Sequence, residues 1–99
     1  MNYETWNMML WITNNKILYT FWQDRAQAIV ANPTYQNEFM SLDRRIITEL
    51  VKELDTYFDD SAADWMGNQS SVFADILNNA LGQINWHEIA EELLISIKE

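Results

Sequence analysis

The only histidine of the chain stands next to two glutamates, in the sequence His87-Glu88-Ile89-Ala90-Glu91. Residues four apart share one face of a helix, so the imidazole and the Glu91 carboxylate could approach a metal ion together. A zinc-protease motif requires a second histidine at the position of Glu91. We therefore interpret this segment as the acidic first turn of a helix, and we predict no metal site.

Paired carboxylates are the other residues that could do chemistry. Asp59-Asp60, and Asp64 beside Trp65, are of the kind that serve as general acid and base when their pKa values differ. No nucleophile, base and orienting group occur together, and an acidic chain contains such pairs by chance. The absence of cysteine excludes disulfides, thiolate metal sites and cysteine nucleophiles. We predict a non-enzymatic protein with no catalytic residue, metal or cofactor.

Acidic residues gather between positions 49 and 64, where Lys52 is the only base. On a helix, steps of three and four residues separate neighbouring carboxylates by about 5 to 6 Å, near the phosphate spacing of a nucleic-acid strand. The sequence leaves two interpretations of this band open: a partner-binding face that mimics DNA, or a solvated face that only maintains solubility. Its members are Glu49, Glu53, Asp55, Asp59, Asp60 and Asp64.

The overall charge of the chain limits the classes of molecule that it can bind. Fifteen acidic and six basic residues give a formal net charge of −9, which disfavours direct binding to DNA, RNA or an anionic membrane. We expect a partner protein with a basic surface. No apolar stretch approaches the roughly 20 residues of a membrane span, and the N-terminus lacks the pattern of a signal peptide, so we expect a soluble, cytoplasmic protein.

Aromatic residues exceed what a small core can hold. Five Trp, four Tyr and four Phe occur in 99 residues, and each buries about 150 to 250 Å² when it lies inside. Some rings should therefore lie on the surface and contact a partner. We assign this role to Trp11, Tyr19 and Trp65.

These residues must be positioned by helices, because the chain has only two glycines and one proline and its apolar residues recur at helical spacing. Helical segments are expected over 3–13, over 16–31 after an interruption at Asn14-Asn15, over 42–58, 71–81 and 86–97. Asn2 and Asn85 are suitable N-caps, with Glu88 completing a capping box, and either Asn14 or Asn15 can cap the second segment. The sequence does not define the structure of residues 32–40 and 59–69.

The two C-terminal segments are separated only by residues 82–85, which favours an antiparallel helical hairpin. Gly82 can take the left-handed conformation that ends the first of them. We expect this hairpin to pack on a stripe formed by Trp6 and Leu10. The predicted fold is one all-α domain, residues 1–99, of four main helices plus short helical turns, closed by the C-terminal hairpin.

Two terminal segments resemble a known family. They are Asn2-Tyr-Glu-Thr-Trp-Asn-Met-Met-Leu-Trp-Ile12, and Phe73-Ala-Asp-Ile-Leu-Asn-Asn-Ala-Leu81 followed by Ile84-Asn-Trp-His-Glu-Ile-Ala-Glu91. The family consists of small uncharacterised proteins carried by bacteriophages, plasmids and some cyanobacterial and archaeal genomes. The resemblance implies a mobile-element origin and, if the protein is phage-encoded, the cytoplasm of the host cell. It supplies no catalytic residue.

Small acidic phage proteins often bind and block a host protein. The resemblance and the charge together favour an inhibitor of a host defence or nucleic-acid-processing protein, of the anti-CRISPR or anti-restriction type, acting by DNA mimicry. The alternative is a homodimer or other homo-oligomeric assembly protein without an inhibitory role. In that case the aromatic surplus of the first two helical segments is the self-interface, and the charge only maintains solubility.

Overall fold

The computed structural model describes residues 1–66 and 72–98, without the side chains of Trp65 and Met66. Within these residues the chain forms five helices and no strand, which confirms the prediction of a single all-α domain. The helices are α1 (Tyr3–Asn14), α2 (Lys16–Ala31), α3 (Leu42–Met66), α4 (Val72–Gly82) and α5 (Trp86–Ser96). None of these helices combines the length and apolar character that a bilayer crossing requires.

Asparagine side chains begin three of the helices, as predicted. The Oδ1 atoms of Asn2, Asn15 and Asn85 accept hydrogen bonds from backbone amides two or three residues into α1, α2 and α5, at 2.8, 3.0 and 3.1 Å. Asn15 has an extended backbone, with φ −102° and ψ 105°, so it ends α1 as well as capping α2. The N-terminal half is therefore two separate helices, in agreement with the separate segments predicted over 3–13 and 16–31. All five predicted segments form helices in the described residues, although the fold prediction counted only four of them as main helices.

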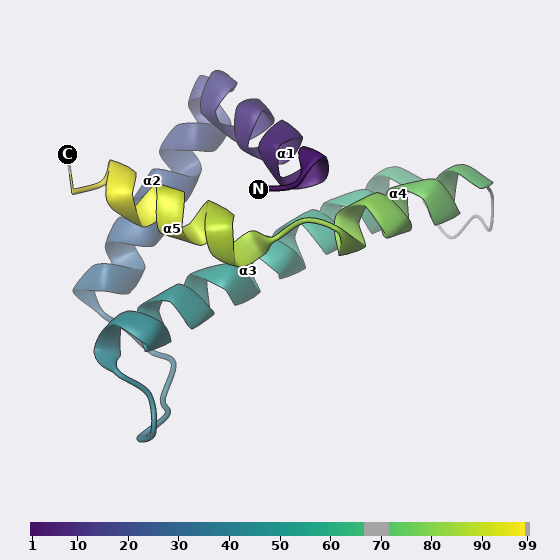
Figure 1. Ribbon diagram of the computed structural model, residues 1–99. Coiled ribbons are helices and arrows are strands. Elements are labelled where there is room, and N and C mark those ends of the chain that lie inside the picture. The colour runs from purple at the N-terminus through teal and green to yellow at the C-terminus, as the bar shows by residue number, and fades with distance from the viewer. Residues whose placement is uncertain (67–71, 99) are drawn as a thin grey trace.

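Helix α3 is the longest element and supports the others. Its 25 residues extend over about 37 Å. It continues two turns past Phe58, where the sequence left the structure open, because no glycine or proline occurs between Phe58 and Met66. Residues 33–40, also left open, contain a turn but no helix. Helices α2 and α5 pack on the first part of α3, and α4 lies along its second part (Figure 1).

The predicted C-terminal hairpin is not formed. Helices α4 and α5 follow one another along α3, both running opposite to it, and α5 packs on α3, α2 and α1 (Figure 1). Helix α4 ends in a tightened turn, with Gln83 N donating to Ala80 O at 3.1 Å and Ile84 N to Leu81 O at 3.2 Å. Gly82 does not adopt the left-handed conformation that would reverse the chain. Residues 83–85 therefore continue the chain in the direction of α4 and do not reverse it.

The core lies between α2, α3 and α5, with one residue from α1. A stack of rings connects the three main helices: Phe58 lies 6.2 Å from Trp22 and 5.2 Å from Trp86, measured between ring centroids. Of the four tryptophans whose side chains the structure describes, Trp22 and Trp86 are thus buried in the core. The buried apolar residues are Ile12, Trp22, Ala26, Ile29, Ile46, Leu50, Leu54, Trp86, Ile89, Ala90, Leu93 and Leu94.

Helix α1 presents a different face to the core than predicted. Thr5 and Ile12 are fully buried, whereas Trp6 and Leu10 remain 51% and 36% exposed, so the predicted Trp6/Leu10 stripe does not carry the packing. Because α1 is apolar nearly all round, its spacing does not select a face. The face is selected by a polar contact, in which Thr5 Oγ1 accepts a hydrogen bond from the Asn85 amide at 2.8 Å.

Further contacts hold the N-terminus against the joint between α4 and α5. Asn2 Nδ2 donates to Gln83 O at 2.6 Å, and the terminal ammonium lies 3.8 Å from Glu88 Oε2. Since the Asn85 amide is bonded to Thr5, Glu88 completes the capping box differently than predicted: its Oε1 accepts from Asn85 Nδ2 at 3.1 Å. The start of α1 and the start of α5 therefore form one hydrogen-bonded unit.

Candidate functional site

Two carboxylates of the predicted acidic band are used inside the fold. Glu53 accepts two hydrogen bonds from the Arg25 guanidinium, at 2.8 and 3.0 Å, which joins α3 to α2. Glu49 Oε1 accepts from the amides of Thr34 and Tyr35, at 2.8 and 2.6 Å, and from the Thr34 hydroxyl. Partial burial raises the pKa of Glu49, but these hydrogen bonds outweigh it and lower the pKa below its ordinary value. Glu53 thus joins α3 to α2, and Glu49 joins α3 to the loop at Thr34 and Tyr35.

The other four members of the band lie on the second half of α3 and are exposed. Asp55 and Asp59 are four residues apart, as are Asp60 and Asp64, so each pair forms a row along the helix. We call these four residues the acidic arm. Partial burial, followed by the charges of Asp55 and Asp60, raises the pKa of Asp59. None of the four forms an ion pair with any residue of 1–66 or 72–98.

Helix α1 carries a second candidate surface on its outer side. Tyr3, Trp6, Leu10 and Trp11 are 70%, 51%, 36% and 67% exposed, and we call them the aromatic face. The rings of Tyr3 and Trp6 lie 6.2 Å apart at the start of the helix. A groove near the end of the helix is lined by Asn7, Leu10, Trp11, Asn14 and Asn15.

The three aromatic residues predicted to contact a partner are placed differently from one another. Trp11 is on the surface, Tyr19 is half-buried and packs against the core, and the Trp65 side chain lies outside the described residues. Sequence reasoning missed Tyr3 and placed Trp6 inside. Asn7 and Asn14 could have identified the outer side of α1, because polar residues seven apart mark the solvent-facing side of a helix.

The segment around His87 forms an exposed pair. His87 Nδ1 and Glu91 Oε1 lie 2.6 Å apart, four residues apart on α5, and both side chains are at least half exposed. In the described part of the chain, no group of three or more His, Cys, Asp or Glu side chains is arranged to hold a metal ion.

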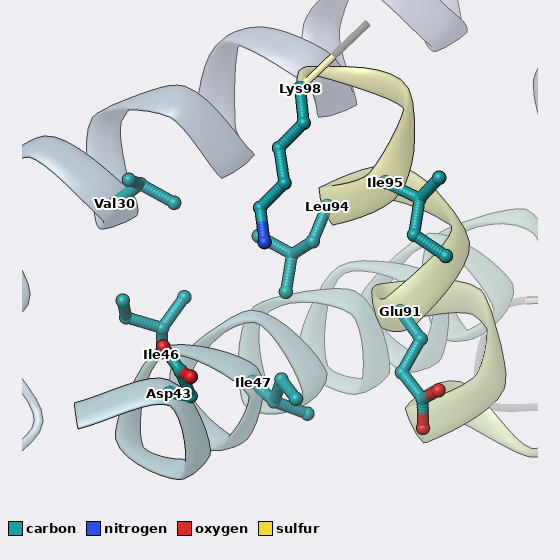
Figure 2. A pocket seen from close by; sticks show the side chains of 8 residues that line it. All are labelled: Val30, Asp43, Ile46, Ile47, Glu91, Leu94, Ile95 and Lys98. Atoms are coloured by element: carbon teal, nitrogen blue, oxygen red, sulfur yellow. The ribbon is translucent and has the colours of Figure 1, made fainter. Parts of the chain in front are cut away.

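An apolar cleft of about 260 Å³ opens between α2, α3 and α5 (Figure 2). Figure 2 shows the Lys98 side chain reaching into it alongside Leu94, with Asp43 and Glu91 among the lining residues. The cleft contains a cation and two carboxylates but no nucleophile beside a base, so its residue types do not define a reaction. Its lining residues are Val30, Asp43, Ile46, Ile47, Glu91, Leu94, Ile95 and Lys98.

The fold and these surfaces define a small, strongly acidic, all-α protein with an acidic arm and an aromatic face. Comparisons with protein-family models, curated proteins and solved structures find no match. The resemblance of segments 2–12 and 73–91 to the mobile-element family therefore stays a prediction. The two segments touch, because Asn2 and Thr5 bond to residues 83 and 85.

Proposed function

We propose that the protein is a non-enzymatic binding module whose acidic arm occupies a basic groove of a partner protein and blocks it. The partner would be a host defence or nucleic-acid-processing protein in the host cytoplasm, and the mode of action would be DNA mimicry of the anti-restriction or anti-CRISPR type. The observation that carries this proposal is the contrast within one band. Glu49 and Glu53 accept hydrogen bonds from other parts of the fold, while the four aspartates beyond them have no basic partner among residues 1–66 and 72–98.

The position of the arm supports contact with a concave surface. The second half of α3, with α4 alongside, extends beyond the other three helices (Figure 1). A helix holds its carboxylates at fixed separations of about 5 to 6 Å within each row, so little side-chain order has to be created on binding. A groove that accepts a nucleic-acid strand has cationic side chains at comparable intervals.

The electrostatics favour the same partner. Partial burial, and after it the like charges of Asp55 and Asp60, raise the pKa of Asp59, and the lysines or arginines of a basic groove would neutralise these charges. The net charge of −9 would also accelerate association with a cationic surface, because long-range attraction raises the on-rate.

The test compares two variants with the same change of net charge. The arm variant is Asp55→Asn, Asp59→Asn, Asp60→Asn and Asp64→Asn. The control neutralises four exposed acids elsewhere and consists of Asp24→Asn, Glu38→Gln, Asp43→Asn and Glu92→Gln. Each protein is used as bait in a host lysate, and the affinity for the captured protein is then measured between about 50 and 500 mM salt.

We expect the arm variant to bind at least about tenfold more weakly than the control, and wild-type binding to weaken steeply with salt. The captured protein should bind DNA, and its activity on DNA should fall when the wild-type protein is added. Equal binding by the two variants would show that net charge alone is responsible. An affinity independent of salt would refute charge mimicry.

A further inference from the structure

The aromatic face of α1 has no role in the binding proposed for the acidic arm. We propose that it is the contact between two copies of this chain, related by a twofold axis that passes near the middle of α1. The protein would then be a homodimer in which two α1 helices pack antiparallel, with both acidic arms left free.

The exposed apolar area is large enough for a specific contact. An aromatic side chain offers about 150 to 250 Å² in total, so the exposed fractions of Tyr3, Trp6 and Trp11 leave on the order of 400 Å² uncovered on one helix. Leu10 and the flanking Asn7 and Asn14 enlarge this area. The face is therefore smaller than the roughly 800 Å² per partner of a standard protein interface, and it matches in size the largest apolar patches on monomers, about 300 to 600 Å², many of which are binding sites.

The charge distribution favours a second copy over a basic partner. Between Glu4 and Lys16 the sequence has no ionisable residue, so the stretch of the aromatic face from Trp6 to Trp11 carries no charge, and Glu4, seven residues before Trp11, lies at its edge. Two molecules with a net charge of −9 repel each other least when their uncharged faces meet. A cationic protein would gain no attraction at this face and would be drawn instead to the acidic arm.

The shape of the face is complementary to itself. The Tyr3–Trp6 ring pair is at the start of α1, and the groove beside Leu10 and Trp11 is near its end. A twofold axis between them places the ring pair of each copy against the groove of the other, which is the reciprocal contact that an isologous interface requires. Asn7, close to the axis, has an amide that both donates and accepts, so it can pair with its own counterpart.

The face is also held in a fixed orientation. Asn2 and Thr5 on the opposite side of α1 are hydrogen-bonded to Gln83 and Asn85, at 2.6 and 2.8 Å. Two copies can therefore associate without first ordering this helix, which reduces the entropy lost on binding.

The first test is the molar mass in solution, measured by sedimentation equilibrium between about 1 and 300 µM. Trp11→Glu places a charge in the groove, and Phe39→Glu makes the same kind of change at a residue that is 90% exposed in the loop before α3. We expect the wild type and Phe39→Glu to be dimers. For Trp11→Glu we expect the dissociation constant of the dimer to be at least about 100-fold larger than for the wild type. Circular dichroism checks that both variants fold.

Salt separates this inference from the proposed function. Higher salt screens the repulsion between the two acidic copies, so the dimer should tighten between about 50 and 500 mM salt, whereas binding by the acidic arm should weaken. A wild type that stays monomeric at every concentration would overturn the dimer. An equal loss of association in Trp11→Glu and Phe39→Glu would overturn the placement of the contact on α1. Neither result bears on the acidic arm.

The absence of cysteine allows a second test of the axis. Asn7→Cys places one thiol near the twofold axis, and Gln27→Cys places one on an exposed part of α2. Under mild oxidation, we expect Asn7→Cys to form a disulfide-linked dimer at least about tenfold faster than Gln27→Cys, because disulfides require Cα atoms within about 7 Å of each other. Equal rates would refute this arrangement of the two helices.

Discussion

Replacing Thr5 by valine tests how the two ends of the chain are joined. Thr5 is fully buried, and its hydroxyl oxygen accepts the amide hydrogen of Asn85, which lies 80 residues further along the chain. Valine has nearly the same shape but no acceptor. The change therefore removes the hydrogen bond between α1 and the start of α5 while leaving the packing of α1 largely intact.

The expected loss of stability follows from the group left behind. A fully buried amide without a partner costs about 1 to 3 kcal/mol. The hydrogen bond of the Asn85 amide is only partly buried, so the lower part of this range applies, and the additional buried methyl group of valine offsets about 0.8 kcal/mol of it. We expect Thr5→Val to lower the free energy of unfolding by up to about 1 kcal/mol, which lowers the Tm of a domain of this size by up to roughly 8 °C.

Hydrogen exchange at the Asn85 amide provides the decisive assay. Thr5→Ser is the control, since it retains the hydroxyl and loses one buried methyl group, at a cost of about 1 kcal/mol. The Asn85 amide should lose its protection in Thr5→Val and keep it in Thr5→Ser, beyond the change expected from overall stability. Wild-type protection of the Asn85 amide in Thr5→Val would refute the role of Thr5 as the acceptor.

Three further substitutions test the core and the charged groups. Phe58→Ala removes the ring between Trp22 and Trp86. Because Phe58 is only partly buried, the loss in the free energy of unfolding in urea should lie below the roughly 3 to 5 kcal/mol of a fully buried ring, but above the loss for Tyr57→Ala at a residue 39% exposed. The lowered pKa of Glu49 means that its carboxylate stabilises the fold above its ordinary pKa of 4.5 and loses this effect as the pH falls through the folded-state pKa. In Glu49→Gln, the free energy of unfolding should therefore fall less steeply as the pH is lowered through the acid range. The same fall as in the wild type would contradict this role of Glu49. The raised pKa of Asp59 means that its ionised carboxylate destabilises the fold. Asp59→Asn should therefore raise the urea midpoint of unfolding at pH 7 and have no effect at a pH below the folded and unfolded pKa values of Asp59.

Local features were largely predictable from the sequence. The N-caps at Asn2 and Asn85 were identified, and that of α2 was narrowed to Asn14 or Asn15, because each cap depends on an amide only three residues away. The extent of α3 was underestimated, since a run of aspartates weakens a helix only slightly and nothing between Phe58 and Met66 ends it.

The candidate surfaces were predictable only in part. The acidic band was visible in the sequence, but the use of Glu49 by the loop at Thr34 and of Glu53 by Arg25 was not, since these contacts join residues 14 to 28 positions apart. Trp11 was correctly placed on the surface, whereas Tyr19 packs against the core. Exposure of a ring on a helix that is apolar all round depends on which side the neighbouring helices cover.

The sequence by itself determined the helical class and most helix ends, because periodicity and capping act within one or two turns. Only the tertiary structure decided the direction of the chain after Gly82, the face of α1 that is covered, and the carboxylates that remain unpaired. Each of these depends on a partner distant in sequence: α3 for the C-terminal helices, Asn85 for Thr5 and Arg25 for Glu53.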